Sequence, residues 1–155
     1  IAVLNIFGNT DLARAAAAAL AQKLDAVDYA VLVTAEAKSI PLICALAIAV
    51  EKPYVVLRKT HKPYMGDSLR AETLSITTGK PQTLYLDEKD RALISGKRIA
   101  LIDDVISTGS TLQAMRLLMS KAGAEVSAEA AILTEGERSQ WEHTYALGHL
   151  PLFTG

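Results

Sequence analysis

The chain has 155 residues, of which 50% are hydrophobic and 21% are charged, and its formal net charge is −1. This length and composition are typical of one globular domain with a buried core rather than of a disordered chain. The lack of a basic excess argues against a broad nucleic-acid-binding surface, and no apolar run reaches the length of a membrane span.

Cys44 is the only cysteine, so no disulfide can form within the chain. It lies in the apolar run ICALAIAV, where we expect a buried thiol in a reducing compartment. No secretory signal is recognisable. We therefore expect a cytoplasmic protein with neither a membrane nor a nucleic acid as its partner.

The first third of the chain alternates helix and strand patterns. Asn9 and its two neighbours offer caps to a helix over the alanine-rich run ARAAAAALAQKL. YAVLVT is short, apolar and bounded by polar residues, which predicts a buried strand. A second helix is predicted from about Ile40, with Pro41 in its first turn, and PYVVLR predicts the next buried strand.

The middle of the chain predicts a loop followed by a hairpin. Residues 59–71 have no apolar periodicity and contain Pro63 and Gly66, so we expect a long surface loop. AETLSIT and QTLYL flank the pair Gly79-Lys80 and predict two antiparallel strands joined by a turn.

The remaining patterns complete an α/β order. RIALID predicts a third buried strand, residues 110–122 a helix that ends at Gly123, and EVSAEAAIL a last strand before an irregular tail. Alternating strands and helices predict a single α/β domain over residues 1–155, whose central, mainly parallel sheet is flanked by helices. Ligands of such sheets gather at the carboxyl ends of the strands, where the acidic pair Asp103-Asp104 is expected.

The segment LIDDVISTGST combines this acidic pair with a loop suited to an anion. Residues 107–111 lie between a strand and a helix N-terminus, where N–H groups and the helix dipole favour a negative charge. Taken alone, the loop is explained equally well as an ordinary turn capped by Ser110. The carboxylates would repel a bare anion, but they can accept hydrogen bonds from sugar hydroxyls or orient hydrated Mg²⁺. Together the two features predict a site for a phosphorylated sugar.

Three stretches resemble type I phosphoribosyltransferases. LIDDVISTGST resembles the phosphoribosyl pyrophosphate loop of that family, VTAEAKSIPL is similar to its pyrophosphate loop, and VVLRKTHK resembles the strand that leads into its mobile catalytic loop. The resemblance implies a Rossmann-like fold with a mobile loop or hairpin as a lid and a small hood over the base. Neither G-x-x-x-x-G-K-[ST] nor G-x-G-x-x-G occurs, so nucleoside triphosphate and dinucleotide folds lack support.

The resemblance also implies roles for single residues. Asp103 and Asp104 would bind the ribose hydroxyls and, with Lys59, form the catalytic set. Mg²⁺ would be held near the two aspartates through the substrate and water, without direct protein ligands. The 5-phosphate would be bound by Ser107, Thr108, Gly109, Ser110 and Thr111. Pyrophosphate would be bound by Ala37, Lys38, Ser39, Arg58, Lys59 and Lys62.

The implied activity is transfer of ribose 5-phosphate from phosphoribosyl pyrophosphate to a purine, with release of pyrophosphate, in purine salvage. We expect adenine as the base, because enzymes for 6-oxopurines commonly carry an acidic residue where Ser107 stands. Thr77 instead favours xanthine, because adenine enzymes place a proton-handling glutamate there. The resemblance further implies a homodimer.

A sensor without catalytic activity is the alternative class. The same strings resemble the effector domain of the purine repressors of Gram-positive bacteria, which carry a winged-helix domain in front. No such domain is present in this sequence, and we expect an enzyme. Beyond the motifs, we expect Glu135 and Arg138 to begin a helix rather than to contact the base, and Trp141 to pack in the tail.

Overall fold

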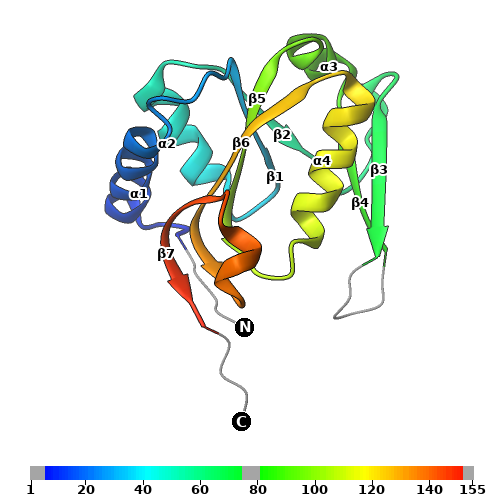
Figure 1. The fold of residues 1–155 in the computed structure, drawn as a ribbon. Helices are drawn as coiled ribbons and strands as arrows, with labels where there is room; N and C mark the ends of the chain where they lie inside the picture. The colour runs from blue at the N-terminus through cyan, green and yellow to red at the C-terminus, as the bar shows by residue number, and fades with distance from the viewer. Residues whose placement is uncertain (1–5, 75–80, 152–155) are drawn as a thin grey trace.

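The structure is a computed structural model that describes residues 6–74 and 81–151. Figure 1 shows a central sheet with helices on both sides. The elements in chain order are α1 (Thr10–Lys23), β1 (Val31–Ala35), α2 (Ile40–Val50), β2 (Tyr54–Leu57), the 3-10 helix η1 (Pro63–Met65), β3 (Leu69–Leu74), β4 (Pro81–Leu86), α3 (Glu88–Ile94), β5 (Arg98–Ile106), α4 (Ser110–Ala122), β6 (Glu125–Glu135), the 3-10 helix η2 (Arg138–Trp141) and β7 (Tyr145–Leu150).

The main sheet has five strands in the order β2-β1-β5-β6-β7. Every neighbouring pair in it is parallel, which confirms the predicted α/β class with a central parallel sheet. Helices α1 and α2 cover one face, while α4 and the antiparallel hairpin β3–β4 cover the other (Figure 1). Each face has its own buried apolar cluster, so the sheet is buried on both sides, as its apolar strands predict.

Local signals account for the helix ends. The Asn9 side chain accepts a hydrogen bond from the Leu12 N–H at 3.0 Å and so caps α1. Pro41 lies in the first turn of α2, where a missing N–H costs nothing. Helix α4 ends at Gly123, whose φ of +74° is favourable only for a residue without a side chain.

Three details differ from the sequence-based expectations. The tail after β6 is not irregular, because it forms η2 and the parallel edge strand β7. Helix α3 was not predicted, since its seven residues are too few to show a clear apolar period. The segment 59–71 is only partly a surface loop: Met65 is buried, and β3 already begins at Leu69.

Two predicted features lie outside the described residues. The hairpin was expected to turn at Gly79-Lys80, and Thr77 was expected near the base, but the structure describes nothing between residues 74 and 81. Strands β3 and β4 themselves pair from Leu69↔Leu86 to Leu74↔Pro81. In the part of the chain that is described, no helix combines the length and apolarity needed to cross a bilayer.

Candidate functional site

The predicted site groups meet at the carboxyl edge of the main sheet. Strands β1, β2 and β5 are neighbours and parallel, so the segments that follow them emerge at the same edge. These segments are the turn 36–39, the basic pair Arg58-Lys59 and the loop 107–111. Parallel pairing therefore brings together three motifs that lie far apart in the sequence.

The acidic pair lies inside β5 rather than after it, because this strand continues to Ile106. Both side chains are partly buried. Asp103 Oδ1 accepts the backbone N–H of Asp104 at 2.8 Å, and Asp104 Oδ1 accepts that of Val105 at 2.8 Å. One oxygen of each carboxylate is thus held by the backbone, which fixes the orientation of both groups.

Burial raises the pKa of the Asp103 carboxyl well above its ordinary value, and the neighbouring Asp104 raises it further. The charge of Lys59 acts in the opposite direction, which places its ammonium within electrostatic range of Asp103. Lys59 and Asp103, which are 44 residues apart in the sequence (103 − 59), therefore lie at the same edge of the sheet.

Residues 107–111 enclose a small cavity suited to an anion. A volume of about 120 Å³ is lined by Asp103 and by residues 105–112. Gly109, with a φ of +84°, stands at the N-cap of α4, so the alternative in which Ser110 caps the helix is wrong. Gly109 has no side chain with which to cap α4, and the Ser110 N–H donates instead to Thr108 Oγ1 at 3.3 Å. The N-terminus of a helix at such a loop is suited to a phosphate.

The other predicted cations lie around this edge. Lys38, Lys59 and Lys62 are exposed, and none of their ammonium groups has an ion-pair partner among residues 6–74 and 81–151. The Ser39 side chain, in contrast, is buried. Its hydroxyl faces the interior, so only its backbone can face a ligand, as the resemblance implies.

Glu36 ties two of these segments together, a role that the sequence did not reveal. Its Oε2 accepts a hydrogen bond from Arg58 Nε at 3.1 Å, and its Oε1 accepts the backbone N–H of Lys59 at 2.7 Å. The peptide between Glu36 and Ala37 is cis. One carboxylate therefore fixes the start of the basic segment against the turn after β1.

A buried hydroxyl network links the same turn to β5. Thr34 Oγ1 donates to the Ile102 carbonyl at 2.6 Å and lies 2.8 Å from Ser39 Oγ. The backbone pairing of β1 with β5 ends at Val33↔Leu101. The Thr34 side chain therefore links the two strands one residue beyond their last backbone pair. The network reaches the peptide that immediately precedes Asp103.

The hairpin β3–β4 also contacts the loop 107–111. Gln82 exchanges hydrogen bonds with Thr111 Oγ1 at 3.0 and 3.3 Å, and Thr73 Oγ1 donates to the Ser110 carbonyl at 3.3 Å. The sequence predicted the hairpin but not these contacts, because nothing in it specifies which face of α4 the hairpin covers.

Two expectations for the segment after β6 are corrected. Glu135 is the last residue of β6 and is buried, so it does not begin a helix. Arg138 begins only the short 3-10 helix η2. Trp141 packs against the core, as expected.

Comparison with known proteins identifies the family. Residues 3–147 match the model of the phosphoribosyl transferase domain. The chain belongs to this family. It is 33% identical over 129 residues to a protein named hypoxanthine/guanine phosphoribosyltransferase from Methanotorris igneus, an alignment that covers 83% of this chain and 67% of that protein. Across the first four such relatives the chain spans between half and two thirds of their length.

Solved structures share the fold. An adenine phosphoribosyltransferase from Thermoanaerobacter pseudethanolicus superposes with a TM-score of 0.77, 95% of this chain and 84% of that chain covered, at 18% identity. The adenine phosphoribosyltransferase of Rhodothermus marinus gives a TM-score of 0.74 with 95% and 83% covered, at 26% identity. The names of the relatives and of the solved structures therefore point to different purines.

Proposed function

We propose that this protein transfers ribose 5-phosphate from phosphoribosyl pyrophosphate to a purine base, in purine salvage. The observation that carries the proposal is the arrangement at one sheet edge: two oriented carboxylates, a loop suited to an anion beside them, and exposed lysines on the segments that follow β1 and β2. A sugar with two free hydroxyls, a 5-phosphate and a 1-pyrophosphate matches all three parts.

Each part has a defined task in this reaction. Asp103 and Asp104 accept hydrogen bonds from the ribose hydroxyls, and their charge favours the positive character that develops at ribose carbon 1. Residues 107–111 hold the 5-phosphate. Lys59, aided by Lys38, Arg58 and Lys62, stabilises the charge that builds on the departing pyrophosphate.

The residues also suit Mg²⁺ bound through the substrate. Carboxylate oxygens are hard ligands that this ion accepts directly or through water. Within residues 6–74 and 81–151, Asp103 and Asp104 each keep one oxygen that no backbone N–H occupies. When bound, the ion would neutralise charge on pyrophosphate. The segment 59–71 begins with Lys59 of the basic pair, and we propose that it closes over the substrate and excludes water.

The base is proposed to be adenine, with a 6-oxopurine as the second candidate. Ser107, in place of an acidic residue, supports adenine, as does the similarity to the Rhodothermus marinus enzyme. The relatives named hypoxanthine/guanine phosphoribosyltransferase support the second candidate. Xanthine remains an alternative on the sequence evidence of Thr77, and a sensor that binds phosphoribosyl pyrophosphate without turnover remains the alternative class.

A panel of bases tests the proposal. Adenine, hypoxanthine, guanine and xanthine are each mixed with the protein, Mg²⁺ and phosphoribosyl pyrophosphate, and pyrophosphate release is followed. The highest kcat/KM is expected with adenine. A clear preference for hypoxanthine or guanine would replace adenine with the second candidate. Binding of phosphoribosyl pyrophosphate without release for any base would identify a sensor.

We further propose a homodimer located in the cytoplasm. Ile48 on α2 is 74% exposed and lines an apolar groove between α1 and α2, a surface that a second copy would cover. Sedimentation at micromolar concentration is expected to show a dimer, and a monomer alone would contradict this assembly.

A further inference from the structure

Trp141 lies against the middle of the phosphate loop. It is the only tryptophan of the chain and the last residue of η2. A Cβ atom added to Gly109 would lie 3.0 Å from Cη2 of the indole and 3.7 Å from its Cζ3. Gly109 also has a φ of +84°, which other residues adopt at a cost. A glycine is thus needed here both for the backbone and for the approach of the ring.

Glu135 links the same indole to Ser107, the first residue of the loop. Trp141 Nε1 donates to the Glu135 carbonyl at 2.9 Å. The Glu135 side chain accepts a hydrogen bond from Ser107 Oγ at 3.4 Å. Glu135 therefore connects to the loop twice, directly through Ser107 and through the indole that covers Gly109.

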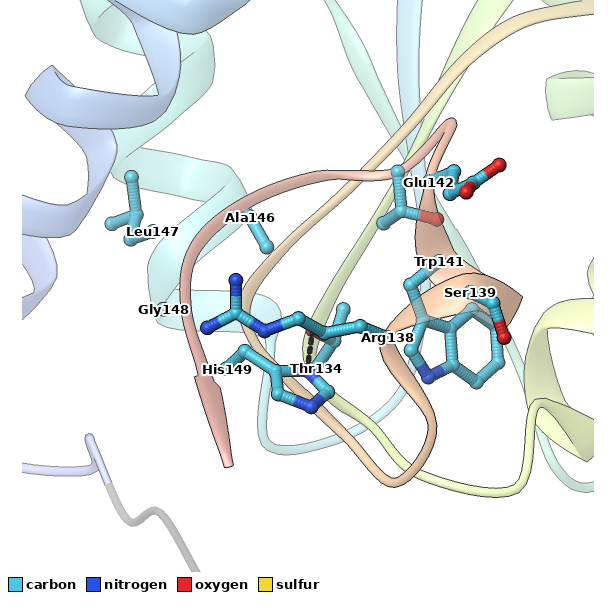
Figure 2. A pocket seen from close by; sticks show the side chains of 10 residues that line it. Thr134, Arg138, Ser139, Trp141, Glu142, Ala146, Leu147, Gly148 and His149 are labelled. Carbon is cyan, nitrogen blue, oxygen red and sulfur yellow. Dashed lines mark hydrogen bonds between the residues drawn. The ribbon is translucent and has the colours of Figure 1, made fainter. Parts of the chain in front are cut away.

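The indole also lines a large cavity. Trp141 and Arg138 project from η2 and His149 projects from β7 around a volume of about 610 Å³ (Figure 2). His149 is held by hydrogen bonds to Thr134 and to the Gly136 carbonyl. The indole thus borders both this cavity and Gly109 of the phosphate loop.

We propose that Trp141 is a positioning residue that holds the phosphate loop in its anion-binding shape before the substrate arrives. A glycine in an unsupported loop has more conformational freedom than any other residue, and ordering it on binding weakens affinity. The indole removes this freedom at Gly109, and its N–H bond to Glu135 fixes the ring. The proposal rests on the proposed function, because it assumes that the loop binds the 5-phosphate of phosphoribosyl pyrophosphate.

The assignment predicts an effect on affinity rather than on chemistry. Trp141 contacts Gly109 of the loop proposed to hold the 5-phosphate and donates to the Glu135 carbonyl. Loss of the ring should therefore raise the KM for phosphoribosyl pyrophosphate about tenfold, which corresponds to about 1.4 kcal/mol of binding free energy. The kcat should stay within about threefold of the wild type.

The test compares Trp141→Ala and Trp141→Phe with the matched control Gln140→Ala. Gln140 is an exposed neighbour in η2 that does not belong to the site. We expect a large rise in KM for Trp141→Ala, a smaller rise for Trp141→Phe, which keeps an aromatic ring but loses the N–H, and none for the control. An unchanged KM in folded Trp141→Ala, or a fall in kcat alone, would overturn the proposal. Trp141→Phe decides the question if the alanine variant does not fold.

Binding of ribose 5-phosphate separates this proposal from the proposed function. The single tryptophan serves as the probe, and its fluorescence in the wild type should change as ribose 5-phosphate fills the loop. A parallel calorimetric titration should give about tenfold weaker binding for Trp141→Ala. Weaker binding together with no turnover of any base by the wild type would contradict only the proposed function. Equal binding by both proteins would overturn the role of Trp141 even if the wild type is active.

Discussion

Replacement of Asp103 by asparagine keeps the shape of the side chain and removes one ionisable carboxyl from β5. In the folded protein, burial and the neighbouring Asp104 raise the pKa of this carboxyl well above its ordinary value, although Lys59 partly offsets them. A carboxyl whose pKa is raised by folding favours the folded state while it is protonated. This contribution is lost as the pH rises through the folded-state pKa. Above that pKa the ionised Asp103 therefore costs stability.

The size of this cost is that of a carboxylate ion that is partly shielded from water. For a partly buried carboxylate that keeps one backbone hydrogen bond, we expect Asp103→Asn to raise the free energy of unfolding by about 1–3 kcal/mol at pH 7–8. For a domain of this size that is a rise in Tm of roughly 2–10 °C. The same substitution should abolish turnover, because Asp103 is proposed to bind the ribose hydroxyls.

Urea unfolding between pH 4 and pH 8 measures this effect. The stability difference between Asp103→Asn and the wild type should be small at pH 4 and grow as the pH rises. Asp67→Asn is the matched control. The Asp67 side chain is 85% exposed, and its oxygen lies as far as 3.9 Å from the Arg91 guanidinium, so this ion pair contributes little to stability. If Asp103→Asn were less stable than the wild type at pH 7, or if its advantage were independent of pH, the reasoning would be refuted.

Two further substitutions test the connections around the site. Thr34→Val removes the hydroxyl that bonds to the Ile102 carbonyl and should lower the free energy of unfolding by about 1–3 kcal/mol. Urea unfolding measures this effect. A change below about 0.5 kcal/mol would show that the hydroxyl network does not stabilise the fold. Glu36→Gln weakens the fixation of Arg58 and Lys59 and should lower kcat about tenfold. Because the ion pair between Arg58 and Glu36 is partly exposed, the substitution should change Tm little. An unchanged kcat in steady-state kinetics would exclude this positioning role of Glu36.

The sequence predicted the strands and helices with long, regular apolar patterns and the acidic pair near the carboxyl end of a buried strand. Alternation of helices and strands implies parallel neighbours, and parallel strands share a carboxyl edge. The meeting of the three motifs also requires β2, β1 and β5 to be neighbours, which only the structure shows. Helix α3 and strand β7 were missed because a seven-residue helix and a half-buried edge strand containing Gly148 carry weak patterns.

The contacts that orient the site could not be predicted in this way. Glu36 bonds to Arg58 across 22 residues and Thr34 bonds to Ile102 across 68. Both bonds depend on the order β2-β1-β5, which the apolar pattern does not specify. The contact of Trp141 with Gly109 likewise depends on the path of the chain between β6 and β7. Residue types thus indicated the chemistry, while the surroundings that fix each group came only from the tertiary structure.

Release of pyrophosphate tests the central claim most directly. The wild type and the double variant Asp103→Asn/Asp104→Asn are compared with phosphoribosyl pyrophosphate and Mg²⁺, with and without adenine and hypoxanthine. We predict release by the wild type that requires a purine, and a loss of at least about 100-fold in the folded double variant. Equal release by both proteins, or release that does not depend on a base, would contradict the account.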